Sequence, residues 1–207
     1  MTVHALLVRR ETTVGSLLAA AVLSSACFGA AVGSYTGRWQ ILMDAVKMPV
    51  YLLGTLALSF GAMHLFAARE LRARQTFAVA LETVALTAVV LGALAPIVGL
   101  LSLSLPFSPG LRSPESQRGY RILILLLTGS VAAGGLAGVE RLRSRLPSAR
   151  LAVIWVVVYQ AVGAQMAWLL KPWVSSTGLD DRFLPLRENL QGNFYESVVR
   201  TVLSFFS

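Results

Sequence analysis

Five long apolar stretches, separated by short polar segments, follow one another along the chain. They cover residues 14–35, 48–68, 76–105, 120–139 and 151–170. A helix needs about 20 apolar residues to cross the hydrocarbon core of a bilayer. The third stretch would be about 45 Å long as a straight helix, so we expect Pro96 to kink it and its last turns to leave the membrane. The pattern predicts an all-α, polytopic transmembrane helix bundle over residues 1–170 and an extracytoplasmic tail over 171–207.

Two further stretches are amphipathic and predict short helices that lie in the membrane interface. Trp39, Leu42, Met43 and Val46 have the i, i+3, i+4, i+7 spacing of one apolar helix face. A second amphipathic helix is expected to begin at Asn193 in the tail. We expect the apolar faces of both helices to rest on the bilayer surface.

The composition excludes an ordinary soluble domain. Only 14% of the 207 residues are charged and 56% are hydrophobic, whereas a soluble domain carries about 25% charged residues. The formal charge is +8, but the basic residues stand in short loops without interleaved aromatics, which argues against nucleic acid as a partner. The single cysteine, Cys27, lies in an apolar stretch and excludes an intramolecular disulfide or a zinc site of paired cysteines.

The distribution of basic residues among the loops predicts the orientation. Each side of the membrane would receive nine Lys and Arg residues. On one side they are concentrated in short loops, and on the other several lie in the long tail beside acidic residues. We therefore expect a bacterial cytoplasmic (inner) membrane, with the amino terminus in the cytoplasm and the carboxyl terminus outside. Anionic lipid headgroups are the expected partners of Arg69, Arg72, Arg74, Arg141, Arg143 and Arg145.

Small residues recur every four positions in the first apolar stretch and again in the fourth. The positions are Ser25, Gly29, Gly33, Gly37, Gly134 and Gly138. Lipid tails give helices no hydrophobic reason to associate, so strips of small residues that let backbones approach closely predict helix packing. We favour packing within the chain, and association into a homo-oligomer is the alternative.

One acidic residue, Glu82, is predicted to lie in the hydrocarbon zone, because it stands about 12 Å along a helix from Arg74. His64, near the end of the second apolar stretch, should reach a comparable depth. The two side chains are therefore candidates for an intramembrane polar pair across antiparallel helices. We interpret this pair as a structural clamp, with ion or proton handling as the alternative.

Charged and aromatic residues near the membrane edges form a second group of candidates. Asp44 and Lys47 are expected to pair and to fix the turn into the second span at Pro49. The outer end of the fifth span carries Gln165, Trp168, Lys171 and Trp173. Trp and Lys residues at such positions typically anchor a helix at the interface, and contact with a partner is the alternative.

Motifs for chemistry are lacking in the sequence. The two histidines, His4 and His64, stand sixty positions apart, and neither a phosphate-binding glycine loop nor a nucleophile-elbow serine is present. We therefore expect no catalytic residue, no bound metal and no cofactor.

Several stretches together resemble a known family. They are GAAVGSY at 29–35, DAVKMP at 44–49, LAPI at 94–97, VGAQMAWLLKPW at 162–173 and GNFYE at 192–196. The chain resembles a bacterial family of small polytopic membrane proteins of uncertain function, often labelled as actin-binding WASP-homology proteins. That family more often shows Arg-Pro-Phe where this chain has Lys171, Pro172 and Trp173. The layout is also similar to that of five-span Yip-type membrane proteins.

Packing motifs outnumber chemical ones along the whole chain. We therefore predict a non-enzymatic integral membrane protein that acts as a structural or assembly subunit of a membrane complex. The first alternative is an oligomeric ion channel or small-solute transporter that uses Glu82 and His64. A membrane-embedded enzyme is the third hypothesis.

Overall fold

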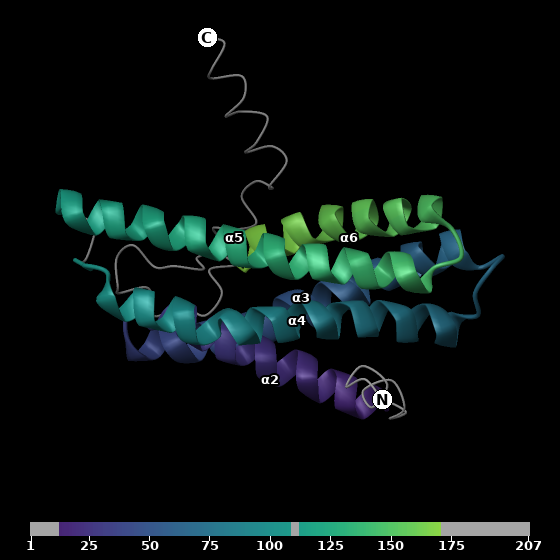
Figure 1. Ribbon diagram of the computed structural model, residues 1–207, viewed down its shortest axis with the longest axis horizontal. Coiled ribbons are helices and arrows are strands. Elements are labelled where there is room, and N and C mark those ends of the chain that lie inside the picture. The colour runs from purple at the N-terminus through teal and green to yellow at the C-terminus, as the bar shows by residue number, and fades with distance from the viewer. Residues whose placement is uncertain (1–12, 109–111, 171–207) are drawn as a thin grey trace, which may run out of the picture.

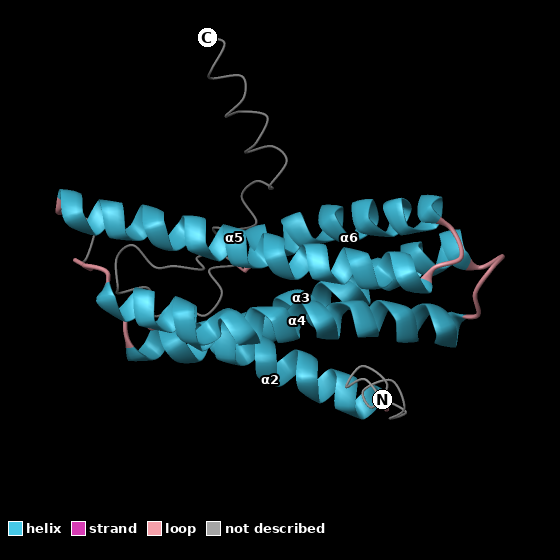
Figure 2. Ribbon diagram, viewed as in Figure 1, coloured by secondary structure: helices cyan, strands magenta, loops and turns pink. Residues whose placement is uncertain are grey.

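The computed structural model describes residues 13–108 and 112–170, and the regular structure in these ranges is α-helical, without a strand (Figure 1, Figure 2). The helices are α2 (Val14–Gly33), α3 (Arg38–Ala67), α4 (Ala73–Ser104), α5 (Pro114–Arg145) and α6 (Ala149–Leu169). All five are long and apolar enough to cross a bilayer. The predicted all-α bundle of five potential membrane spans is therefore confirmed.

Short connections make successive helices antiparallel neighbours. The start of α2 and the turns at 68–72 and 146–148 lie at one end of the bundle, called here the proximal end (Figure 1). The turn at 34–37 and the connection between α4 and α5 lie at the opposite, distal end.

Polar residues fix where three of the helices begin. Thr13, Ser113 and Ser148 are the N-caps of α2, α5 and α6, and each side-chain oxygen accepts a hydrogen bond from the backbone N–H three residues later. Such a bond satisfies one of the donors that a helix start leaves unpaired. Pro114 follows Ser113 within the first turn of α5, where a missing N–H breaks no helical bond.

α3, α4 and α5 are longer than the apolar stretches that predicted them, whereas α2 ends two residues earlier than expected. The fourth stretch was expected to end at residues 120 and 139, but α5 begins six residues earlier and ends six residues later. An apolar window marks only the part of a helix that lipid must cover, whereas the helix itself continues until a cap ends it. α4 contains Pro96 and runs to Ser104, so its 32 residues extend for about 48 Å.

The prediction of a separate interfacial helix near residue 39 is wrong. These residues form the first turns of α3, which continues through Pro49 without a turn. The exposed face of this segment is apolar and consists of Trp39, Leu42 and Val46. The buried face consists of Gln40, Met43, Asp44 and Lys47. Periodicity identifies two faces but not the medium that each one meets, and in a membrane bundle the apolar face can meet lipid while the polar face is covered by protein.

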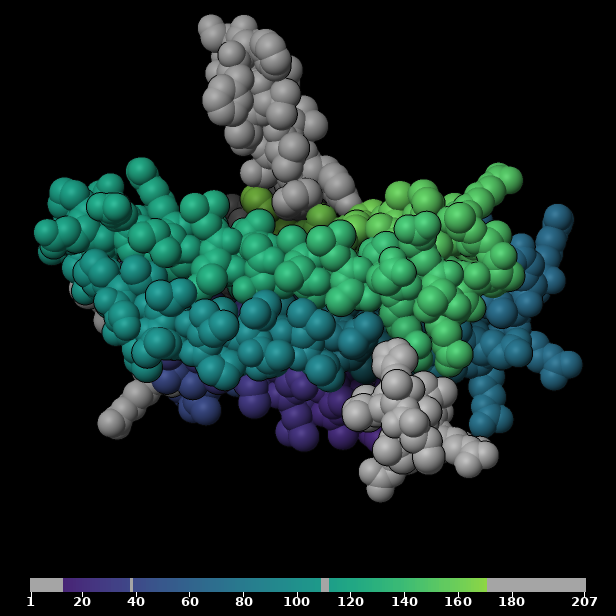
Figure 3. Space-filling view, viewed as in Figure 1, coloured from purple at the N-terminus to yellow at the C-terminus, as the bar shows by residue number. Residues whose placement is uncertain are grey.

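α3 and α4 form the centre of the bundle. α2 packs against both of them, α5 packs against α4, and α6 packs against α3. Figure 3 shows α4 and α5 side by side along one face of the molecule. The contact between α5 and α6 is small compared with these contacts. The fully buried core includes Phe28, Leu81, Leu91, Leu123 and Trp155.

A tyrosine joins the two connections at the distal end. The Tyr35 hydroxyl lies 3.1 Å from the carbonyl oxygen of Pro106 and 3.3 Å from that of Ser116, and both can accept its proton. The ring of Phe107 packs edge-on against the Tyr35 ring, with 5.2 Å between centroids. Burial raises the pKa of the Tyr35 phenol above its usual value, so the hydroxyl keeps the proton that it donates.

Candidate functional site

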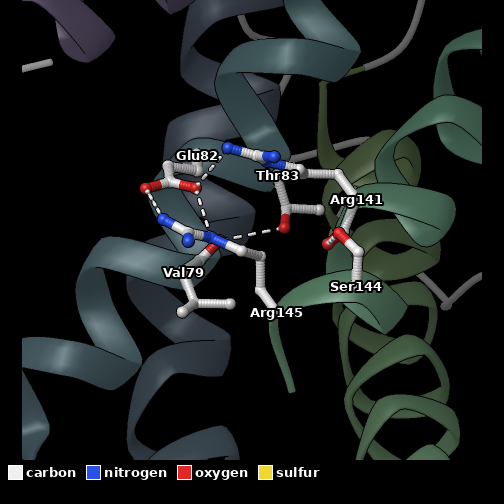
Figure 4. Close-up of polar contacts among 6 residues, drawn as sticks. All are labelled: Val79, Glu82, Thr83, Arg141, Ser144 and Arg145. Carbon is white, nitrogen blue, oxygen red and sulfur yellow. Dashed lines mark hydrogen bonds and ion pairs between the residues drawn. The ribbon is translucent and has the colours of Figure 1, made fainter. Parts of the chain in front are cut away.

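A carboxylate in α4 joins this helix to α5 towards the proximal end. Glu82 lies between Arg141 and Arg145, and these three residues form the Glu82 cluster (Figure 4). Arg145 donates from Nε to Oε2 at 3.0 Å and from a terminal nitrogen to Oε1 at 2.7 Å. Arg141 donates to Oε2 at 3.1 Å. Both carboxylate oxygens of Glu82 are therefore bonded to guanidinium groups.

The two arginines of the Glu82 cluster are only half covered. The side chains of Arg141 and Arg145 are 45% and 46% exposed, and that of Glu82 is 14% exposed. Bidentate pairing gives the contact a fixed geometry, but attraction between partly exposed charges is weakened by water and salt. This arrangement is suited to setting the register of α4 against α5.

The structure does not bring Glu82 and His64 together, so the expected pair of these residues is wrong. His64 Nδ1 lies 3.2 Å from Thr76 Oγ1, and the imidazole stacks on Phe60 with 6.0 Å between ring centroids. The short turn at 68–72 fixes His64 opposite Thr76, and Glu82 lies six residues, or about 9 Å, further along α4. The depth of Glu82 was predicted from its sequence distance to Arg74, and that distance does not show that Glu82 lies further along the bundle than His64.

A second charged group is buried in the distal half of α3. It consists of Gln40, Asp44 and Lys47, which are 6%, 1% and 0% exposed and are called here the Asp44 cluster. Gln40 Nε2 donates to Asp44 Oδ1 at 2.8 Å. The other carboxylate oxygen, Oδ2, is buried and has no hydrogen-bond partner in the part of the chain that the structure describes. Buried polar atoms are nearly always hydrogen-bonded, so this oxygen is a rare exception.

The role expected for Asp44 and Lys47 changes in two respects. The positive charge of Lys47 acts on the Asp44 carboxylate, but the hydrogen bond to Asp44 comes from Gln40. The two residues also do not fix a turn, because α3 is continuous around them. The sequence reading missed Gln40, although its spacing of four residues from Asp44 on a helix could have indicated the contact.

Glycines of α2 lie directly against the backbone that carries the Asp44 cluster. A Cβ atom added to Gly33 would be 2.5 Å from the carbonyl oxygen of Gln40, and one added to Gly29 would overlap the carbonyl group of Asp44. Ser25 is buried on the same helix and donates to the carbonyl of Ala21. The four-residue spacing of these residues therefore corresponds to a close contact between α2 and α3.

The remaining small residues divide into two kinds. A Cβ atom at Gly134 would be 3.2 Å from the Thr87 carbonyl oxygen, and one at Gly138 would overlap the Thr87 hydroxyl, so both glycines face α4. Gly37 is not part of any packing strip, because nothing lies within 4 Å of an added Cβ. It precedes α3 with a φ of 128°, a backbone conformation that favours glycine, so its role is in the turn.

The predicted anchor residues lie partly outside the described ranges. Gln165 and Trp168 are half-buried in the last turns of α6. Lys171, Trp173 and the helix expected from Asn193 lie outside the described residues. The arginines expected to meet lipid headgroups are all exposed towards the proximal end: Arg69, Arg72, Arg74, Arg141, Arg143 and Arg145.

A cavity of about 100 Å³ lies among α3, α4, α5 and α6, and the sequence reading missed it. Tyr159 and Trp155 of α6 contribute to its wall. The Tyr159 hydroxyl donates to the Leu52 carbonyl at 3.1 Å, and Trp155 Nε1 donates to the Met63 carbonyl at 3.0 Å. Their polar atoms are thus bonded to α3. Two aromatic residues four positions apart on one helix were the sequence signal for this wall.

The fold and these sites define an α-helical protein with five potential membrane spans, in which one charged cluster joins α4 to α5 and another is buried within α3. No group of three or more His, Cys, Asp and Glu side chains within the described ranges could hold a metal ion. Comparisons with models of protein families, with curated proteins and with solved structures found no match. The function is therefore argued from the geometry of the chain itself.

Proposed function

We propose that the protein is a non-enzymatic integral membrane protein that acts as a structural or assembly subunit of a membrane complex. The observation that carries this proposal is that Arg141 and Arg145 donate hydrogen bonds to both carboxylate oxygens of Glu82. An intramembrane carboxylate often marks an ion pathway, but this one is engaged on both oxygens by a neighbouring helix. Gly29 and Gly33 of α2 and Gly134 and Gly138 of α5 likewise serve contacts within the chain.

The exposed surface of α3 also supports a role in assembly. Its apolar stripe runs from Trp39 to Phe66, which are 56% and 54% exposed. These residues are separated by about 40 Å along the helix axis, compared with a hydrocarbon core of about 30 Å. Tilting of the helix reduces this difference, and a protein partner or a second copy of the chain would cover the remainder.

We further propose that the protein resides in a bacterial cytoplasmic membrane with its proximal end in the cytoplasm. The short proximal turns carry the exposed arginines, and positively charged loops are retained on the cytoplasmic side. Single cysteines introduced at Arg72 and Arg112 in a Cys27→Ala chain would test this orientation. An impermeant thiol reagent added to intact cells should label position 112 alone, and labelling of position 72 alone would reverse the orientation.

Purification in native lipid, followed by mass spectrometry, tests the assembly role. We expect one stable protein partner, or a second copy of the chain, in stoichiometric amount. The same material in liposomes should pass neither protons nor monovalent cations, and Glu82→Gln should leave that result unchanged. Isolation as a solitary monomer, or a cation flux abolished by Glu82→Gln, would contradict the proposal.

Ion or small-solute transport is a second candidate because of the Asp44 cluster. A buried carboxylate oxygen that has no donor among the described residues is a group that a permeating ion or proton could engage. Transport would then depend on Asp44 rather than on Glu82 and His64. A gradient-driven flux in liposomes that Asp44→Asn abolishes and Glu82→Gln preserves would favour transport over assembly.

A further inference from the structure

The cavity among α3, α4, α5 and α6 reaches the surface of the bundle beside Gln160 of α6. Gln160, which lines it, is exposed, and the contact between α5 and α6 is much smaller than the contacts of α5 with α4 and of α6 with α3. Gly135 of α5 also lines this cavity, and nothing lies within 4 Å of a Cβ added there. The neighbouring Gly134 faces α4 instead. Gly134 therefore lies in the contact between α4 and α5, whereas Gly135 lies beside the open part of the cavity, which is called here the groove.

We propose that this groove binds one acyl chain of an anionic phospholipid, with the phosphate held by Arg143 and Arg150. The wall is mostly aliphatic and aromatic, and a cavity of this kind stays dry in proteins. A volume of about 100 Å³ accommodates a few carbon atoms of a chain, since a dry cavity of about 150 Å³ holds one benzene molecule. A helix from a partner is about 10 Å wide with its side chains and does not fit.

The positions of Arg143 and Arg150 indicate which kind of lipid headgroup would bind. Arg143 stands four residues after Val139, a wall residue, and helical side chains lean towards the preceding turn. We therefore expect the side chain of Arg143 to lie over the proximal side of the groove. Arg150 lies in the first turn of α6 on the other side of the short 146–148 turn, and both arginines are exposed. Four arginines lie near this turn, and they exceed the nearby Glu82 and Glu140 by two charges, which favours an anionic headgroup: Arg141, Arg143, Arg145 and Arg150.

Trp155 provides a direct reporter, because it lines the cavity and is fully buried from solvent. The chain has four tryptophans, so a variant with Phe at the other three retains Trp155 alone. In vesicles of phosphatidylcholine, brominated phosphatidylglycerol should quench Trp155 fluorescence at a low mole fraction. Brominated phosphatidylcholine should require about a five-fold higher fraction for the same effect. A chain that retains only the exposed Trp39 should show no such preference.

Two substitutions locate the binding site. Gly135→Leu should fill the groove and remove the quenching of Trp155, and it should leave the fold intact because its side chain meets open space. Arg143→Gln should remove most of the preference for phosphatidylglycerol while the chain stays folded. Trp155 quenching that Gly135→Leu leaves unchanged, equal quenching by the two lipids, or protection of Trp155 by a co-purified protein would each overturn the proposal.

Discussion

The Glu82 cluster and the Asp44 cluster both place a carboxylate among the helices, but they satisfy it in different ways. Glu82 receives three hydrogen bonds from two half-exposed arginines of another helix. Asp44 is almost fully buried, receives one bond from its own helix and has one oxygen without a partner in the described ranges. A carboxylate among helices is therefore a poor guide to function by itself. Its burial and its hydrogen-bond partners are a better guide.

The difference also determines what each cluster contributes to stability. Partly exposed ion pairs typically contribute less than about 1 kcal/mol. Removing one member of a buried charged pair costs about 3–5 kcal/mol, because the remaining charge is left without compensation. We therefore expect the largest effects in the α2–α3 contact and the Asp44 cluster, and small effects in the Glu82 cluster.

The largest effect is expected for Gly33→Leu. The new side chain would collide with the α3 backbone at Gln40, and the two helices could separate only by uncovering the Asp44 cluster. We expect a loss of more than about 3 kcal/mol in the free energy of unfolding, measured by denaturation in mixed micelles. Gly61→Leu on α3 is the matched control, because an added Cβ there meets nothing within 4 Å. Similar stability of the two variants would refute the close α2–α3 contact.

The next largest effect is expected for Lys47→Met. It would remove the positive charge of Lys47 from the buried Asp44 carboxylate and should cost about 3 kcal/mol. The double variant with Asp44→Asn should recover part of this loss, giving a coupling energy of about 1–3 kcal/mol in a double-mutant cycle. Strictly additive losses would show that the two charges are not coupled.

Replacement of the arginines in the Glu82 cluster should have smaller, graded effects. Arg145 donates two bonds to Glu82 and Arg141 donates one. Arg145→Gln should therefore lower stability by about 1 kcal/mol, and Arg141→Gln by less. Both differences should shrink as the salt concentration rises. An inverted order of the two variants would show that the bidentate contact does not persist in the membrane.

The smallest effect is expected for the coupling energy between Glu82 and His64. The structure gives these residues separate partners, so the double variant Glu82→Gln, His64→Phe should equal the sum of the single variants within about 0.5 kcal/mol. The same micelle denaturation measures it. A coupling well above this value would restore the direct pair that the sequence suggested.

The five spans could be predicted from sequence because each apolar stretch is long enough to cross a bilayer without help from its neighbours. The spacing of Gly29 and Gly33 could also be read, since residues four apart share a helix face. The environment of Glu82 could not be predicted, because sequence spacing within α4 does not say which neighbouring helix lies beside it. The same limit hid the burial of the polar face of α3 around Asp44 and the groove beside Gly135.

The central claim is that Glu82 faces α5 and that both of its carboxylate oxygens are bonded to arginines of that helix. Paired cysteines in a Cys27→Ala chain, treated in native membranes with a short bifunctional thiol reagent, test this claim directly. We predict efficient cross-linking for Glu82→Cys with Arg145→Cys and none for Glu82→Cys with His64→Cys. Cross-linking of positions 82 and 64, with none between 82 and 145, would contradict the account.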